Sequence, residues 1–308
     1  MNEFYKKYRP RRLIDIKGQD QVVSQLTQLV KNEELPHFML FSGPSGCGKT
    51  TLARILMAKS LDITDMDLAE YNSASFRGID MVRDISRQSH LKAIGGGRRG
   101  WIIDECHQLT PAAQEAFLKT LEDTPNHVTF IFCTTEPNKL KKTIRNRATE
   151  FVLKNVSPLA MEHVINRVCN KEKIDLTEEV MDKLIEIAEG SPRKSLILLQ
   201  QIAGIDDPEE QRDCLKKQDV EKDAIDLCRS LINPRGRWKD VAKLLKELEH
   251  DPEQIRRTVL GYCGSILLKG GNMAPRAMMI FDAFRENLFD TGKPGLIAAA
   301  YEMYHNDQ

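Results

Sequence analysis

The chain has 308 residues, of which 41% are hydrophobic and 29% charged. This composition excludes a disordered chain, a collagen-like chain and a disulfide scaffold. The length predicts two or three domains, because single cores rarely grow beyond about 250 residues. Lysine and arginine together number 45 and balance 45 acidic residues, so any contact with nucleic acid must come from a local basic patch.

Two further features bear on the compartment. No apolar run approaches the roughly 18 residues of a membrane-spanning helix, and the first twelve residues are charged where a signal peptide is apolar. The seven cysteines form no CxxC pair, so we expect reduced, mostly buried thiols and no zinc site. We therefore expect a cytoplasmic protein that contacts no membrane.

Strands and helices alternate over the first half of the chain. Helical spacing of apolar residues predicts helices over 19–32, 49–60, 79–91 and 111–121, the last of them capped by Thr110. Short apolar runs predict strands over 38–41, 68–71, 101–103, 128–133 and 151–153. This alternation is typical of a mostly parallel sheet covered by helices on both faces.

From residue 156 onward only helices are predicted. Ser157, Thr177 and Ser191 each fit a helix start, which predicts a small helical unit over 156–205. The stretch 206–223 holds eight acidic and four basic residues, and we expect a domain boundary there. Residues 220–308 again show helical spacing, which we expect to break at 270–271 and 292–295.

The last segment contains large aromatic residues and a pair of arginines. Trp238, Tyr262 and Phe281 recur at helical spacing, and we expect them in the core of this segment. We expect Arg256 and Arg257 on a solvated surface.

A phosphate-binding pattern lies between a predicted strand and a predicted helix. Residues 43–50 read GPSGCGKT and satisfy GxxxxGK[ST], in which glycines let backbone N–H groups surround phosphates at a helix N-terminus. Lys49 is expected to reach the β- and γ-phosphates of ATP, and the Thr50 hydroxyl is expected to bind Mg²⁺. The predicted ATP-binding residues here are Gly43, Pro44, Ser45, Gly46, Cys47, Gly48, Lys49, Thr50 and Thr51.

An acidic pair follows the predicted strand 101–103. Asp104 is expected to hold Mg²⁺, and Glu105 to act as the general base that polarises the attacking water. The tetrad Asp-Glu-Cys-His also matches the DExH box of superfamily 2 helicases. A helicase is therefore an alternative at this point.

Further short motifs occur in a fixed order around these two sites. They are YRP at 8–10 with IKGQ at 16–19, NSAS at 72–75 with RGID at 77–80, CTTEP at 133–137, IRNRA at 144–148 and EGSPR at 189–193. In this order they resemble the AAA+ clamp loader ATPases, such as replication factor C small subunits, phage clamp loader ATPases and the gamma/tau subunit of bacterial DNA polymerase III. The resemblance covers residues 4–205. It implies an α/β P-loop NTPase (AAA+) domain over 1–155, a helical lid domain over 156–205 and an all-α collar domain for oligomerisation over 220–308.

The resemblance also implies roles for residues outside the phosphate site. In the family the opening box closes over the adenine, which implies nucleotide contacts for Tyr8, Arg9, Pro10 and Gly18. Thr135, preferred here over Thr134, takes the place of the first sensor of the γ-phosphate. Arg193 takes the place of the second sensor, at the start of a lid helix.

The arginine finger of the family is expected within residues 144–148. Arg147 takes its place and would enter the ATP site of the neighbouring subunit to stabilise transition-state charge. Asn146 and Ala148 depart from the family's Ser-Arg-Cys motif. Arg145 stays open as the alternative finger.

A basic stripe on the helix 79–91 is the expected DNA contact. Arg83, Arg87 and His90 share one helical face and Arg77 stands at its start, so they can meet phosphates without reading bases.

The resemblance implies an ATPase that opens a sliding clamp and places it on primer-template DNA, with ATP and Mg²⁺ as cofactors. It would act in a hetero-oligomer with other loader subunits, a pentamer holding several copies of this chain. The alternatives are another AAA+ machine, such as a helicase loader or branch-migration motor, and a scaffold that binds ATP without turnover.

Overall fold

The computed structural model describes residues 3–76, 78–95, 97–233, 236–248 and 250–305. The chain forms two compact units that divide between Pro208 and Glu209. The division of the chain into a P-loop domain, a lid and a collar stays a proposal. No helix among the described residues is long and apolar enough to cross a lipid bilayer.

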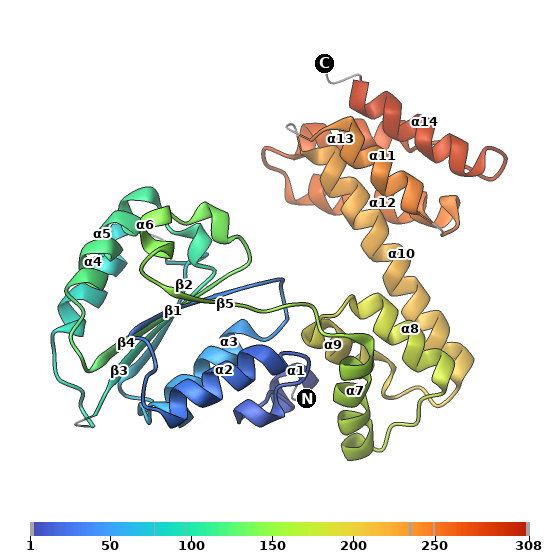
Figure 1. Ribbon diagram of the computed structural model, residues 1–308. Coiled ribbons are helices and arrows are strands. Elements are labelled where there is room, and N and C mark those ends of the chain that lie inside the picture. Colours follow the sequence, from blue (N-terminus) through green and yellow to red (C-terminus); the bar gives the residue numbers. More distant parts are fainter. Residues whose placement is uncertain (1–2, 77, 96, 234–235, 249, 306–308) are drawn as a thin grey trace. The chain divides into compact units, whose positions relative to one another are not determined.

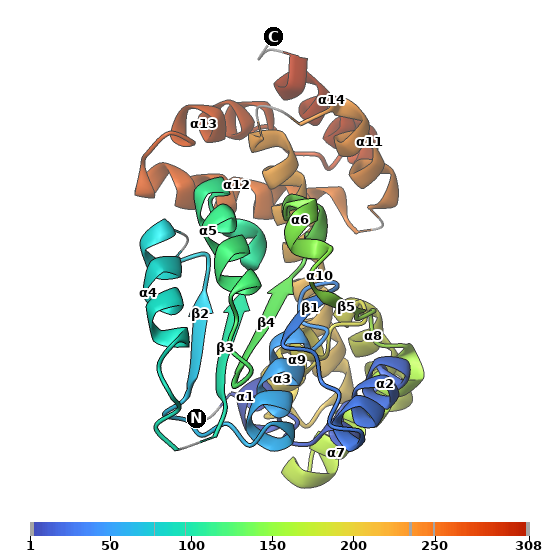
Figure 2. The ribbon, with the colours of Figure 1, turned by 60° about the vertical axis from the view of Figure 1, so that its left-hand side comes forward.

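A five-stranded parallel sheet forms the centre of the first unit, as predicted. Its strands are β1 (Phe38–Ser42), β2 (Leu68–Asn72), β3 (Arg99–Asp104), β4 (Val128–Thr134) and β5 (Thr149–Val152). They lie side by side in the order β2-β3-β4-β1-β5 (Figure 2), and all four pairs are parallel. The carboxyl ends of β1, β4 and β3 therefore meet at one edge of the sheet, with β4 in the middle.

Helices cover both faces of this sheet (Figure 1). They are α2 (Asp20–Lys31) and α3 (Lys49–Ile55) on one face, and α4 (Ile79–Ser89), α5 (Pro111–Glu122) and α6 (Lys142–Arg145) on the other. Alternation along β1 explains the two layers: Met39 and Phe41 pack toward α2 and α3, and Phe38 and Leu40 pack toward α4 and α5. All residues of β1 and β4 are buried, as expected for a sheet covered on both faces.

Strand β3 begins two residues before the predicted strand. Arg99, in a basic stretch, belongs to the strand because its backbone pairs with Val128 of β4. Its Nε lies 3.4 Å from the buried carboxylate of Asp67. Its guanidinium also lies over the Trp101 ring, 5.6 Å from the ring centroid.

The end of the first unit is helical, as predicted. It contains α7 (Pro158–Glu172), α8 (Glu178–Ala188) and α9 (Pro192–Ile202), whose N-caps are Ser157, Thr177 and Ser191. Each cap hydroxyl accepts a backbone N–H of the first turn. The short α1 (Phe4–Lys7) packs against α9, where the Phe4 N–H donates to Gln200 Oε1 at 2.8 Å.

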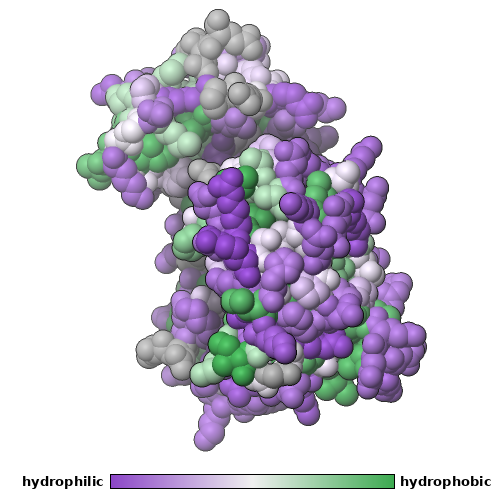
Figure 3. Space-filling model, turned by 90° about the vertical axis from the view of Figure 1, so that its left-hand side faces the viewer, coloured by the Kyte–Doolittle hydropathy of each residue, from purple (hydrophilic) through white to green (hydrophobic). Residues whose placement is uncertain are grey.

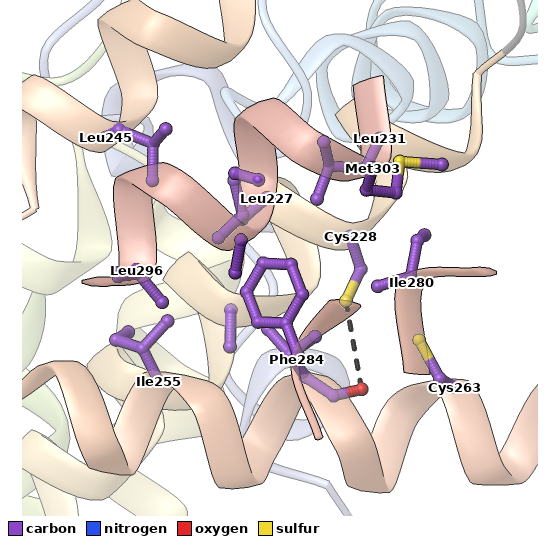
Figure 4. Packing of buried hydrophobic residues seen from close by; sticks show 14 of the residues in the cluster. Leu227, Cys228, Leu231, Leu245, Ile255, Cys263, Ile280, Phe284, Leu296 and Met303 are labelled. Carbon is purple, nitrogen blue, oxygen red and sulfur yellow. Dashed lines mark hydrogen bonds between the residues drawn. The ribbon is translucent and has the colours of Figure 1, made fainter. Parts of the chain in front are cut away.

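The second unit is all helical. Its helices are α10 (Pro208–Ile232), α11 (Trp238–Glu247), α12 (Pro252–Lys269), α13 (Ala274–Ala283) and α14 (Gly292–His305). Buried apolar side chains from all five helices meet in one core (Figure 4). Trp238, Tyr262 and Phe281 are partly buried and pack against this core, as expected.

Two sequence features of this unit differ from expectation. The polar stretch 206–223 is mostly helical and forms the first part of α10, because its apolar positions Leu215 and Val220 are buried among the charges. The break expected at 292–295 is instead the first turn of α14. A proline is tolerated there because N–H groups in the first turn have no partner within the helix.

The cysteines are free thiols. Six of the seven are buried and Cys214 is half-buried, in agreement with the composition.

The prediction of a solvated arginine pair is wrong for Arg256. Its side chain is 10% exposed, and its Nε and Nη2 donate to both carboxylate oxygens of Glu253 at 2.8 and 2.7 Å. Its Nη1 donates to the carbonyls of Phe284 and Arg285, each at 3.1 Å. Glu253 also accepts the Leu288 N–H. This buried ion pair ties α12 to the segment that follows α13.

We expect Arg256→Ala to lower the free energy of unfolding of this unit by about 3 kcal/mol, because it removes the buried cation that pairs with the buried Glu253 carboxylate. Hydrogen exchange of the α12 amides in the full chain measures this. Arg257→Ala is the matched control: its Nε bonds the same Glu253 at 3.0 Å, but its side chain is 65% exposed, so we expect less than about 1 kcal/mol. Equal losses in both variants would contradict the account.

The same pair predicts acid sensitivity. The hydrogen bond from Arg256 holds the pKa of Glu253 at about 2, below its ordinary value of 4.5. Since the pKa is lowered in the folded state, the stabilisation is complete above pH 4.5 and is lost as the pH falls toward 2. Thermal unfolding of the full chain followed by circular dichroism should show this decline, and the decline should be smaller in Glu253→Gln. The same decline in both proteins would rule this carboxylate out as its source.

Candidate nucleotide-binding site

The P-loop (residues 43–50) joins the end of β1 to the start of α3 at the carboxyl edge of the sheet. Gly43 and Gly46 have φ angles of +147° and +77°, which disfavour other residues. A Cβ atom on Gly43 would lie 2.4 Å from the Leu153 carbonyl oxygen, and one on Gly46 would lie 2.1 Å from Ser191 Oγ. Glycine is therefore required where the loop passes β5 and where it passes the cap of α9.

Lys49 lies beneath this loop at the first position of α3, and its side chain is buried. Its Nζ donates to the carbonyls of Gly43 at 2.9 Å and Pro44 at 2.8 Å. An ammonium group has three N–H donors, so one is left for a phosphate oxygen held by the loop. This arrangement agrees with the predicted role of Lys49.

Thr50 and Asp104, the two predicted metal ligands, are in contact. The Thr50 hydroxyl donates to Asp104 Oδ2 at 2.9 Å, which joins the first turn of α3 to the end of β3. A hydroxyl and a carboxylate fit Mg²⁺, which takes oxygen ligands and shares its other positions among phosphates and water. No cluster of three or more His, Cys, Asp or Glu side chains that could hold another metal occurs among the described residues.

Glu105 lines the same pocket as Lys49, Thr50 and Asp104. Its φ of +50° and ψ of +39° are left-handed, a conformation that costs a residue other than glycine about 1 kcal/mol or more. Its N–H donates to Asp104 Oδ1 at 3.0 Å. The chain thus turns sharply after β3 and directs two successive carboxylates toward the phosphate site.

The end of β4 carries the two candidates for the first sensor. Thr134 is fully buried, and its Oγ1 accepts the Glu136 N–H at 3.0 Å and lies 3.1 Å from His107 Nδ1. Thr135 is half-buried, and neither threonine lines the pocket. The hydrogen bonds at this strand end therefore involve Thr134, whereas the sequence favoured Thr135 as the first sensor. The assignment of the first sensor stays a proposal.

The opposite wall of the pocket comes from the N-terminal segment. Tyr8, Arg9 and Pro10 line it as predicted. Gly18 does not line it: a Cβ atom there would lie 2.8 Å from Val156 Cγ1, so this glycine serves close packing.

Gln19 next to it is buried and anchors the same segment. Its side-chain amide donates to the Lys154 carbonyl at 2.7 Å and accepts the Lys154 N–H at 3.1 Å. The segment that carries the pocket wall is thus fixed to the chain after β5.

Helices α7 and α9 close the pocket. Arg193, in the first turn of α9, lines it as predicted. His163 and Arg167 of α7 also line it, and Arg167 Nη2 donates to the Tyr8 carbonyl at 3.1 Å. Sequence reasoning missed both, although their spacing of four residues on one helical face was a signal for them.

Tyr8 and Glu172 tie the N-terminal segment to α7. The Tyr8 hydroxyl donates to Glu172, which also accepts Lys7 Nζ at 2.6 Å. These hydrogen bonds, first that of Lys7, lower the pKa of Glu172. Glu172 is therefore an acceptor for both groups at neutral pH.

Comparison with known proteins shows which families the chain is similar to. The family model described as "Rad17 P-loop domain" matches residues 1–96. The family model described as "DNA polymerase III, delta subunit" matches residues 59–157. The DNA polymerase III subunit gamma/tau of Mycobacterium tuberculosis is 34% identical over 221 residues, which are 64% of this chain and 38% of that protein. The replication factor C small subunit of Methanoregula boonei is 36% identical over 197 residues, 63% of this chain and 61% of that protein.

The chain is a relative of the AAA+ clamp loader ATPases. The resemblance expected from the motifs is thereby confirmed, and the match spans 38% of the length of the gamma/tau relatives. Among solved structures, the Thermotoga maritima RuvB Holliday junction branch migration motor has a TM-score of 0.58 and 20% identity, and the match covers 73% of this chain and 80% of that chain. This likeness supports the AAA+ fold alone.

The two candidate arginine fingers of this clamp loader relative differ in their surroundings. Arg145 is half-buried, and its Nη1 and Nη2 donate to Asn138 Oδ1 at 3.1 Å and Glu150 Oε2 at 3.5 Å. Arg147 is exposed, and it bonds Glu122 of α5 and the Thr143 carbonyl. Arg147 is thus the more accessible of the two to a neighbouring subunit.

The expected DNA stripe lies on α4, on the side of the molecule that Figure 3 faces. Arg83 and Arg87 are exposed there, but each pairs with an acid three residues earlier, Asp80 and Asp84. The stripe therefore alternates in charge. Arg77, the other predicted DNA contact, lies outside the described residues.

Proposed function

We propose that this chain is an ATPase subunit of a DNA sliding-clamp loader. The observation that carries the proposal is the contact between Thr50 and Asp104, which joins the P-loop to the acidic strand end in a relative of clamp loader ATPases. ATP is the substrate, and Mg²⁺ the metal that the site fits.

The P-loop and Lys49 bind the phosphates. Backbone N–H groups of the loop and of the first turn of α3 would surround the phosphates, and the spare donor of Lys49 would add a positive charge there. Thr50 and Asp104 would hold Mg²⁺, which when bound neutralises charge that develops on the phosphates. Tyr8, Arg9 and Pro10 line the far side of the pocket, where the adenine of ATP would lie.

Glu105 is the general base for ATP hydrolysis in this proposal. Its carboxylate, 34% exposed and beside Asp104, accepts the proton of the water that attacks the γ-phosphate. Arg193 brings a cation from α9 to the same phosphate and couples these helices to the nucleotide state. Thr135 or the adjacent Thr134 is the sensor at the end of β4.

Arg147 acts in trans. An exposed arginine just after α6 can enter the ATP site of a neighbouring copy, where a guanidinium stabilises the charge of the transition state. The ATP sites then lie between subunits of a hetero-oligomer, a pentamer with several copies of this chain. Arg147 must first leave Glu122.

Hydrolysis is coupled to a sliding clamp and to DNA. ATP favours the state that grips and opens the clamp, because that state makes more contacts with the γ-phosphate. Primer-template DNA, contacted through phosphates by Arg77, Arg83 and Arg87, triggers hydrolysis and release. The complex acts at the replication site in the cytoplasm.

Affinity capture tests this assignment. Tagged protein is captured from its native cell with a slowly hydrolysed ATP analogue, and the proteins bound to it are identified by mass spectrometry, with Lys49→Ala as the control bait. We expect a ring-shaped clamp and another loader subunit, both depleted with the control. Capture of a replicative helicase or a recombination protein instead would assign the ATPase to a helicase loader or branch-migration motor. In a separate unwinding assay, ATP-dependent strand displacement would assign it to a DExH helicase.

A further inference from the structure

We propose that His107 is a positioning residue that holds the general base Glu105 in place and links it to the end of β4. This inference rests on the proposed ATPase function and deepens it. The residue is the last of the Asp-Glu-Cys-His tetrad, and no role in hydrolysis follows for it from the sequence.

The imidazole of His107 is enclosed, and each of its nitrogens faces different partners. Its side chain is 5% exposed. Nδ1 lies 3.4 Å from Glu105 Oε2 and 3.1 Å from Thr134 Oγ1. Nε2 lies 3.5 Å from Glu136 Oε1 and 3.0 Å from Gln108 Nε2, toward the solvent. The Nδ1 edge therefore faces the catalytic side, and the Nε2 edge faces outward.

Glu105 needs such a support because its backbone is strained. Glu105 has a left-handed backbone conformation and directly precedes the short 3-10 helix Cys106–Gln108, which carries His107. Cys106 within this turn is fully buried beneath the sheet edge, so the turn is anchored while the Glu105 side chain stays partly exposed. The imidazole is the group on this turn that reaches the carboxylate and restricts its rotamers.

The other contact of Nδ1 connects the base to the sensor strand. Thr134 ends β4, which lies between the strands that carry the P-loop and the acidic pair. Its hydroxyl oxygen contacts both His107 and the Glu136 N–H. A shift of this strand end when the γ-phosphate is present would therefore move the imidazole and with it Glu105.

Two substitutions separate the edges of the ring. His107→Asn keeps a polar atom near the position of Nδ1, and His107→Gln keeps one near the position of Nε2. We expect the kcat of ATP hydrolysis to fall about tenfold in His107→Ala and in His107→Gln, and to recover to within about threefold in His107→Asn. The KM for ATP and its Kd should stay within about twofold, because the ring does not line the pocket. Gln108→Ala, which removes the outward contact, is the matched control.

The assay uses the complex that the chain forms with its co-purifying subunits, in the presence of primed DNA. In a Glu105→Gln background, His107→Ala should cause no further loss of kcat, since the ring acts through that carboxylate. If His107→Ala does not fold, the Asn and Gln variants still give the comparison.

The outcomes separate this inference from the function on which it rests. Turnover by the wild type that falls strongly but stays measurable in Glu105→Gln supports the proposed ATPase site whatever His107 does. Equal kcat in His107→Gln and wild type, or an additive loss in the double variant, would overturn the positioning role alone. A wild-type complex without turnover would overturn both.

Discussion

Lys49→Ala should abolish ATP binding and lower ATP turnover by at least about a hundredfold. The ammonium is buried under the P-loop and holds the Gly43 and Pro44 carbonyls, so its loss removes both the charge that faces the phosphates and a support of the loop. Isothermal titration with ATP and a steady-state hydrolysis assay measure the two effects.

The control for this variant is a lysine from the same stretch of chain. Lys59→Ala removes an exposed lysine ten residues later, in the π-helical turn that extends α3. We expect wild-type affinity and turnover from it. Undiminished hydrolysis by Lys49→Ala would place the ATP site elsewhere.

Arg147→Ala should keep ATP affinity and lose DNA-stimulated turnover by about a thousandfold. The side chain is exposed in the turn after α6 and does not line the pocket of its own chain, so only the hydrolysis that a neighbour assists should respond. Turnover of the assembled complex with and without primed DNA, together with ATP binding by the isolated chain, measures this.

Arg145→Ala separates the two candidate fingers. Its guanidinium bonds Asn138 and Glu150 within the same chain, so its loss should lower stability by about 1–3 kcal/mol and leave turnover per folded complex nearly unchanged. Glu122→Ala, which frees Arg147, should also keep turnover. Normal turnover in Arg147→Ala, or its loss only in Arg145→Ala, would reject Arg147 as the finger.

Local patterns predicted much of the fold and of the phosphate site. The P-loop, the acidic pair and the caps Thr110, Ser157, Thr177 and Ser191 are readable because each depends on a few adjacent residues. The register that brings Thr50 within 2.9 Å of Asp104 follows from parallel strands whose carboxyl ends share one edge.

What the sequence could not predict depends on partners far along the chain. Arg256 and Arg257 look alike in sequence. Only Arg256 packs against the segment after α13, where its guanidinium donates to two backbone carbonyls. Gly18 resembles a ligand-binding glycine, but its constraint comes from Val156, 138 positions later. His163 and Arg167 enter the site only because α7 packs beside the N-terminal segment.

Retention of the clamp on DNA is the direct assay of clamp loading by this chain. The captured clamp, carrying a label, is incubated with the complex and primed circular DNA, and label that remains after a high-salt wash is counted. We expect retention only with ATP, its loss when the circle is linearised, and none with the Lys49→Ala complex. Equal retention without ATP, or with Lys49→Ala, would contradict it.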